Sequence, residues 1–266
     1  MNQLLESLLA DLAAEGDQLY AVVSGLDDSA DGGWATPTPA EGWTVATQVA
    51  HLLWTDETAT IAATDKEKWD AIVIEAIGDP EGFVDTSAHE VARLQPQALL
   101  ARWGQARAAL RDALRTYPEG QKMPWFGPPM SPTSMATARF METWAHALDV
   151  YDALDARPEP TDRIKHVAHL GVRTRNFAFG VHELEPPAEE FRVELTSPSG
   201  ELWLWGPDDA AQRVSGSALE FCLLVTQRIH RDDTDLHAQG ADAEKWLTIA
   251  QAFAGPPGEG RAAHDG

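Results

Sequence analysis

Two histidines and one glutamate have the residue types and spacing to hold a metal ion. Glu142 and His146 stand four apart in RFMETWAHALD, so a helix would present both on one face. His51 precedes them by about ninety residues, in the segment GWTVATQVAHLLW. Two imidazoles and one carboxylate are a sufficient ligand set for a catalytic zinc with open coordination positions. If two helices bring the three together, the sequence predicts a metal centre inside a helical bundle.

The spacing alone is weak evidence, because the chain contains three pairs in which an acidic residue precedes a histidine by four positions. These pairs are Glu142/His146, Asp162/His166 and Asp233/His237. A surface pair that stabilises a helix has the same spacing. The apolar neighbours of His51 and His146 favour a metal site, because polar groups in apolar surroundings need partners.

The elements that must position these residues are mainly helices. Apolar periodicity and end signals predict helices over 3–25, 44–64, 87–117, 132–155 and 161–185, with 65–80 continuing the second. Thr44 is a predicted N-cap, and Ser131-Pro132 places a cap and a proline at the start of a helix. Pro96 marks a kink or a later true start in the 87–117 run.

The hydrophobic pattern of the sequence changes near residue 187. FRVELTSPSGELWLWGP alternates apolar and polar residues around a turn, which indicates a β-hairpin. Short strands near Val214 and 235–238 and helices over 217–228 and 242–254 follow, and the last dozen residues are expected to be disordered. The fold class is therefore α+β, with a helical part before a small mixed part.

Composition narrows the function classes. The 266 residues carry a formal net charge of −22, which argues against binding to nucleic acid or an anionic membrane. No apolar run approaches the roughly 18 residues of a membrane helix, and the acidic start does not resemble a signal peptide. We expect a cytoplasmic protein. The single cysteine, Cys222 in LEFCLLV, is expected in the core, so any thiol chemistry needs a thiol from outside the chain.

The segment GWTVATQVAHL, followed much later by an E-x-x-x-H helix, resembles the DinB-like metal-binding superfamily. The resemblance is closest to the mycothiol-dependent maleylpyruvate isomerase type, and it covers nearly the whole chain. That family joins an N-terminal four-helix metal-binding bundle to a small C-terminal α+β domain similar to sterol carrier proteins. The resemblance implies a bundle over 1–187, a sterol-carrier-like domain over 188–254 and a tail over 255–266.

The resemblance also implies roles for individual residues. His51 matches the first histidine of the family, and Glu142 and His146 match its later glutamate and histidine, which together bind a divalent metal, usually zinc, with water completing the shell. Mycothiol or a related small thiol is the implied cosubstrate. An arginine of the C-terminal domain helps to hold the acidic substrate in the isomerase type, and Arg228 is the nearest match by position. The sequence around it departs from the isomerase pattern, which leaves the substrate open.

Further candidates lie on the predicted helix 161–185. Arg173 or Arg175 could bind an anionic substrate, and the alternative is a bundle helix with solvated charges. A second metal at His166 and His169 lacks an identifiable third ligand. In the bundle, Arg139 could orient Glu142 or pair with an acid on the surface.

Four aromatic residues complete the candidates. They could line a pocket between the domains or belong to the core, and they are Trp125, Phe126, Trp203 and Trp205.

The leading hypothesis is a zinc-dependent thiol transferase or isomerase that acts on a small, anionic electrophile with a thiol such as mycothiol. One alternative is a thiol-independent hydrolase or cyclase that uses metal-bound water. It needs a separate general base, for which Asp56 and Glu57 are candidates. A second alternative is a metal- or ligand-binding protein without turnover, and an oligomer is compatible with all three.

Overall fold

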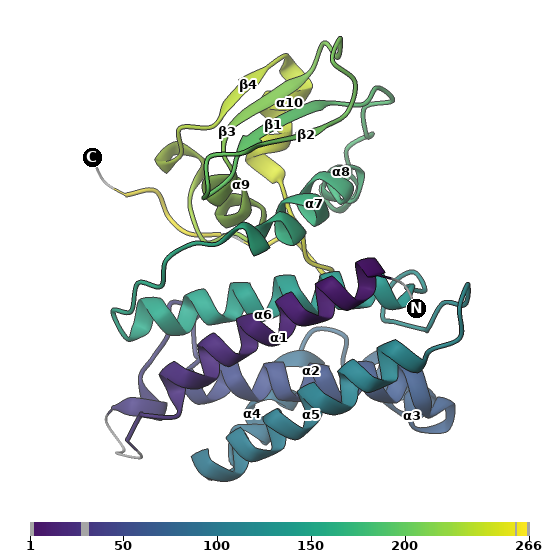
Figure 1. Cartoon of the computed structure of the whole chain (residues 1–266), viewed down its shortest axis with the longest axis vertical. Helices are drawn as coiled ribbons and strands as arrows, with labels where there is room; N and C mark the ends of the chain where they lie inside the picture. The colour runs from purple at the N-terminus through teal and green to yellow at the C-terminus, as the bar shows by residue number, and fades with distance from the viewer. Residues whose placement is uncertain (1–2, 28–31, 259, 265–266) are drawn as a thin grey trace. The chain divides into compact units, whose positions relative to one another are not determined.

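The structure, a computed structural model, describes residues 3–27, 32–258 and 260–264. The chain packs as two compact units, Met1–Pro158 and Glu159–Gly266 (Figure 1). The first is helical, and the second holds a small sheet with its own helices. The predicted α+β fold class, with a helical bundle first and a small mixed domain after it, is confirmed.

Four long helices form the bundle of the first unit: α1 (Gln3–Val23), α2 (Val45–Thr64), α5 (Pro96–Thr116) and α6 (Pro132–Ala153). Helix α2 packs on α5 and α6, and α1 packs on α6 and α5. Two shorter helices, α3 (Lys66–Gly78) and α4 (Phe83–Val91), follow α2, and a 3₁₀ turn, η1 (Gly33–Ala35), precedes it. Because α2 and α6 are packed neighbours, the bundle brings the helices of the candidate ligands together.

Local signals fix where these helices begin. The hydroxyl of Thr44 accepts a hydrogen bond from the Thr47 amide, and Ser131 accepts one from Ser134 with Pro132 at the first helical position. Both predicted caps are confirmed. The expected 87–117 helix is wrong as a single element: α4 ends at Val91 and α5 begins at Pro96, since a proline fits a first turn better than a helix interior.

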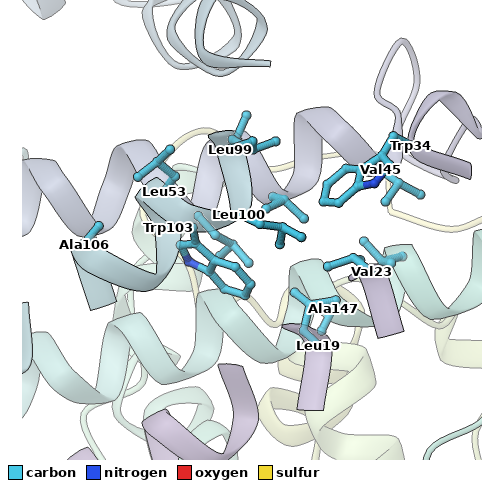
Figure 2. Close-up of a cluster of buried hydrophobic side chains, with 14 of the residues drawn as sticks. Leu19, Val23, Trp34, Val45, Leu53, Leu99, Leu100, Trp103, Ala106 and Ala147 are labelled. Carbon is cyan, nitrogen blue, oxygen red and sulfur yellow. The ribbon is translucent and has the colours of Figure 1, made fainter. Parts of the chain in front are cut away.

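A continuous apolar core holds the bundle together (Figure 2). It takes side chains from α1, α2, α5 and α6, including Leu19, Val23, Val45, Leu53, Leu99, Leu100, Trp103, Ala106 and Ala147, and Trp34 from η1. Each of these is buried, and burying one large apolar side chain contributes about 1.5–3 kcal/mol. The core therefore fixes α2 against α6 and sets the positions of the side chains at their interface.

The second unit is built on a four-stranded sheet in the order β2-β1-β3-β4. Strands β1 (Arg192–Thr196) and β2 (Leu202–Trp205) form the predicted antiparallel hairpin, β3 (Arg213–Ser217) lies parallel to β1, and β4 (His237–Gln239) is antiparallel to β3. The helices are α7 (Lys165–Arg173), α8 (Arg175–Val181), α9 (Ala218–Val225) and α10 (Ala241–Ile249), with 3₁₀ turns η2 (Asp162–Ile164) and η3 (Arg231–Asp233). Gly200 closes the hairpin turn with φ 91°, a left-handed conformation that favours glycine.

Two features of this unit differ from the expected pattern. The predicted helix 161–185 is divided at Thr174, whose hydroxyl bonds to the carbonyls of Leu170 and Gln251. The domain boundary expected at residue 187 follows the change from a helical to an alternating sequence pattern. The compact units divide after Pro158, because α7 packs on α9 and α8 packs on α10. The sterol-carrier likeness of 188–254 and the disorder of 255–266 stay predictions. None of the helices in the described ranges has the length and apolar character that crossing a membrane requires.

Candidate metal centre

His51, Glu142 and His146 converge in the bundle. One ligand atom from each of them lies within 4.8 Å of the others. Glu142 Oε2 lies 3.2 Å from His146 Nε2 and 3.6 Å from His51 Nε2, and the two imidazole centroids are 4.4 Å apart. In the part of the chain that the structure describes, no other group of three His, Cys, Asp or Glu residues meets this criterion. Three side chains from two helices thus offer lone pairs to one point in space.

Indole rings enclose the two imidazoles. The ring of Trp43 stacks on that of His146, with centroids 5.8 Å apart and an interplanar angle of 17°. It is tilted against the His51 ring, with centroids 5.4 Å apart. Trp54 lies 6.1 Å from His51 on the same helix. The side chain of His51 is 9% exposed, that of His146 15% and that of Glu142 25%. The site is therefore sheltered from water, and it is most open at the carboxylate.

The surroundings set the protonation states in the absence of a metal ion. Burial, helped by the nearby His146, lowers the pKa of His51 to about 4. Burial alone would raise the pKa of Glu142, but hydrogen bonds and charge interactions with His146 and His51 outweigh it and hold that pKa well below its usual value. A neutral imidazole and an ionised carboxylate are the forms that bind a cation.

Sequence reasoning missed a second layer of residues around His146. Gln48 Oε1 lies 2.5 Å from His146 Nδ1, and Gln48 Nε2 donates to Thr38 Oγ1 at 2.9 Å and to Asp149 Oδ2 at 3.5 Å. Gln48 and Asp149 are buried. One signal pointed to them: Gln48 lies three residues before His51 and Asp149 three after His146, so both share helix faces with the ligands.

Arg139 has neither of the roles expected from the sequence. Its Nε donates to Asp56 Oδ1 at 2.9 Å in the bundle interior, and Trp103 Nε1 donates to the other carboxylate oxygen at 3.3 Å. Both side chains of this ion pair are almost fully buried. Glu57, the neighbour of Asp56, accepts two 2.7 Å hydrogen bonds from Arg102. Both carboxylates considered as general bases are therefore engaged by arginines.

The other two acid–histidine pairs have no comparable arrangement. Asp162 lies in η2 and accepts hydrogen bonds from the amide and hydroxyl of Ser199, while His166 lies in α7. Asp233 lies in η3, and His237 lies in β4. Neither pair shares a helix, so the geometry that the spacing implies does not arise.

The candidate arginines of the second unit differ in how many hydrogen bonds their guanidinium groups make. Arg175 donates to the Asn176 side chain and to two loop carbonyls, and its guanidinium lies 4.3 Å from the centroid of the Phe191 ring. Arg228 donates to the Thr226 carbonyl. Arg173 is exposed and makes no hydrogen bond or ion pair with any residue that the structure describes.

The remaining candidates belong to packing or to local contacts. Cys222 is buried, and burial raises the pKa of its thiol well above the usual value, which confirms the core assignment. Trp205 donates to His169 Nδ1 at 3.2 Å, and Trp203 is buried. In the first unit, Trp125 and Phe126 pack on Trp69. A metal at His166 and His169 still lacks a third ligand among the described residues.

Comparison with known proteins gives matches over both units. Residues 12–151 match the family model of the mycothiol maleylpyruvate isomerase N-terminal domain, and residues 187–239 match a model described as wyosine base formation. Two Mycobacterium tuberculosis relatives, "Uncharacterized protein MT0041" (strain CDC 1551 / Oshkosh) and "Uncharacterized protein Rv0036c" (strain ATCC 25618 / H37Rv), are each 56% identical over 253 residues. These alignments cover 95% of this chain and 97% of each relative.

Two solved structures share the fold. The crystal structure of the mycothiol-dependent maleylpyruvate isomerase has a TM-score of 0.56 and 18% identity, and the match covers 90% of this chain and 95% of that one. A mutant of that enzyme has a TM-score of 0.55 and 17% identity, with 86% and 92% covered. At this identity the likeness establishes the fold alone, whereas the family model spans more than half of the chain. The chain therefore belongs to the family defined by the mycothiol maleylpyruvate isomerase N-terminal domain.

Proposed function

We propose that this protein is a zinc-dependent thiol transferase or isomerase, which uses a low-molecular-weight thiol such as mycothiol on a small, anionic electrophile. The observation that carries the proposal is the convergence of His51, Glu142 and His146 within 4.8 Å. Membership of the mycothiol maleylpyruvate isomerase family supports the thiol and the isomerase chemistry.

The donor set fits a zinc ion. Two imidazole nitrogens and one carboxylate oxygen are common zinc ligands, and three protein ligands leave a coordination position for a further molecule. Glu142 Oε2 stands between the Nε2 atoms of both histidines, so all three donors face one another. A divalent cation held there would keep one net positive charge and would lower the pKa of a thiol that binds beside it.

The residues of the chain supply the surroundings of that chemistry. Trp43 and Trp54 exclude water from the imidazoles, and a drier site strengthens every electrostatic interaction within it. The thiol must come from outside, because the thiol of Cys222 is buried and its pKa is raised.

Two observations favour the thiol reaction over metal-assisted hydrolysis. A hydrolase needs a general base within reach of its attacking water. Asp56 is buried in an ion pair with Arg139, and Glu57 is bound by both arms of the Arg102 guanidinium. Neither carboxylate is free to take a proton at the site.

The anionic substrate needs a cationic partner. Of Arg173, Arg175 and Arg228, we favour Arg173, because it alone of these three makes no hydrogen bond with the described residues. Arg175 and Arg228 stay candidates from the sequence. Replacing Arg173 with Met should raise KM for an anionic electrophile, while Arg175→Met should mainly lower stability.

The test measures metal and thiol binding on the full-length protein. Elemental analysis should find about one zinc per chain in the wild type and none in His146→Ala. Adding mycothiol to the cobalt-loaded protein should change its visible spectrum, because a sulfur ligand alters the ligand field. Titration calorimetry should detect the same binding event.

Each outcome decides a separate part of the proposal. An equal zinc content in the wild type and His146→Ala would contradict the proposed metal site. Stoichiometric zinc without any spectral or calorimetric response to the thiol would leave the metal and remove the thiol mechanism. Phe177→Ala, which truncates an exposed side chain in the second unit, is the control and should leave zinc content unchanged.

A further inference from the structure

We propose that Gln48 is a positioning residue that holds the hydrogen of His146 on Nδ1, so that Nε2 faces the metal centre and is the nitrogen left to bind a metal. This inference rests on the proposed function, because it concerns how the chain prepares a metal ligand. It adds a residue that lies one step away from the metal and gives that residue a defined task.

The direction of the Gln48 amide follows from its other partners. Its Nε2 lies 2.9 Å from Thr38 Oγ1 and 3.5 Å from Asp149 Oδ2. A carboxylate oxygen only accepts, and the Thr38 hydroxyl donates its proton to the Trp43 carbonyl at 3.1 Å. Both neighbours therefore present lone pairs, and the amide nitrogen must face them. A flipped amide would place its oxygen against the carboxylate of Asp149.

The amide direction fixes the tautomer of His146. Because Nε2 of Gln48 donates to Thr38 and Asp149, its Oε1 is the atom that lies 2.5 Å from His146 Nδ1. A carbonyl oxygen has no proton to give, so Nδ1 must carry the hydrogen and donate it. In the neutral imidazole, Nε2 then holds the lone pair. Which nitrogen binds a metal is commonly set by the hydrogen bond that the other nitrogen makes.

This arrangement leaves Nε2 of His146 as the nitrogen that faces Glu142. His146 Nε2 lies 3.2 Å from Glu142 Oε2. In the metal-free protein the two atoms share a hydrogen bond, and a metal ion bound to both would take its place. Gln48 thereby turns a histidine–glutamate contact into a pair of ligands that point at a shared position.

His51 provides an internal contrast. Its Nδ1 is buried and has no hydrogen-bond partner among the described residues. Nothing equivalent to Gln48 selects its tautomer, although its Nε2 also faces Glu142. The positioning effect is therefore specific to His146, and the two histidines should respond differently in an experiment that resolves them.

The test replaces Gln48 in two ways. Gln48→Leu keeps most of the volume and removes the acceptor. The double variant Gln48→Glu/Asp149→Asn keeps an acceptor facing Nδ1 and puts an amide in place of the Asp149 carboxylate. Thr143→Val is the matched control, because it removes another buried side-chain hydrogen bond of α6, from Thr143 to the Arg139 carbonyl. Zinc affinity is measured by competition with a chelating dye, and the His146 ring is observed by NMR of histidine labelled with ¹⁵N.

Gln48→Leu should bind zinc roughly 10–100-fold more weakly than the wild type, the range seen for outer partners of metal-bound histidines. The double variant Gln48→Glu/Asp149→Asn should recover most of that affinity, and Thr143→Val should keep all of it. The zinc-loaded wild type should show an exchange-protected Nδ1–H signal that is absent from His146→Ala. Gln48→Leu should also change the visible spectrum of the cobalt-loaded protein.

An unchanged zinc affinity in Gln48→Leu would overturn the positioning role while leaving the metal site intact. A wild type that binds no zinc would instead overturn the proposed function. If Gln48→Leu does not fold, the NMR measurement on the zinc-loaded wild type still decides the matter. A His146 ring protonated at Nε2, with its Nδ1 as the metal ligand, would contradict the proposal.

Discussion

Helices α2 and α6 build two polar clusters about one turn apart. One cluster joins His51 of α2 to Glu142 and His146 of α6, and the other joins Asp56 of α2 to Arg139 of α6. Both come from the same pair of helices and depend on the same apolar core. They differ in how their polar groups match one another.

In the Asp56–Arg139 cluster the charges are opposite and cancel. The acid accepts from Arg139 Nε and from Trp103 Nε1, so each carboxylate oxygen has a donor. In the histidine cluster, Glu142 Oε2 faces the Nε2 atoms of His51 and His146, and all three atoms are ligand types that bind a metal ion. An imidazole can give up a proton to make room for a metal ion, whereas the guanidinium of Arg139 keeps its protons. The comparison separates a pair that stabilises the fold from a set arranged for a ligand.

The largest expected effect is the loss of metal from the histidine cluster. Glu142→Gln removes the anionic ligand and should reduce zinc to below stoichiometric detection, as measured by elemental analysis. The metal-free variant should have a free energy of unfolding about 1–2 kcal/mol below that of the metal-free wild type, because the amide cannot replace the interactions of the carboxylate with His146 and His51. Stoichiometric zinc in this variant would contradict the role of Glu142.

The next effect should appear in stability and not in metal content. Arg139→Met leaves the buried Asp56 carboxylate without its cation, which should cost about 3–5 kcal/mol in the free energy of unfolding. Urea denaturation measures the change, and elemental analysis should still find zinc. The double variant Arg139→Met/Asp56→Leu should recover much of the loss, because it removes the stranded charge as well.

A smaller effect should follow pH in the metal-free protein. The pKa of His51 is about 4 in the folded protein and 6.5 in the unfolded chain. Between these pH values the unfolded chain binds a proton at His51 and the folded chain does not. The free energy of unfolding should therefore fall by about 2 kcal/mol between pH 7 and pH 5 and should fall further toward pH 4. Glu142 does not contribute to the change between pH 7 and pH 5. Its lowered pKa stabilises the folded protein above the ordinary carboxyl pKa, and this contribution is lost only at lower pH.

Urea unfolding at the two pH values checks this expectation, with His51→Asn as the control. The control should lose most of the difference between pH 7 and pH 5, since it has no imidazole to protonate in the unfolded chain. An equal difference in both proteins would assign the pH dependence to other groups.

The smallest effect belongs to the exposed ion pair beside the two clusters. Arg102 bonds to Glu57 through two nitrogens, but its side chain is 49% exposed. Arg102→Met should change the free energy of unfolding by at most about 1 kcal/mol and should leave zinc unchanged. A loss as large as that of Arg139→Met would mean that burial does not distinguish the two arginines.

Local sequence patterns are enough to locate several elements of this protein. Apolar periodicity and caps at Thr44 and Ser131 located α2 and α6, because helix formation and termination are decided within a few residues. Alternation around Gly200 located the hairpin for the same reason. The three candidate ligands were also accessible, since their spacing and their apolar neighbours are local features.

Tertiary structure decided which polar groups meet. The spacing of Glu142 and His146 recurs in two other pairs, and only packing of α2 on α6 added His51 to one of them. The contacts of Gln48 with His146 and of Asp56 with Arg139 join residues more than eighty positions apart, so no local pattern encodes them. Buried polar groups take whichever partners the packed helices bring within hydrogen-bond distance, and that choice exists only once the core has formed.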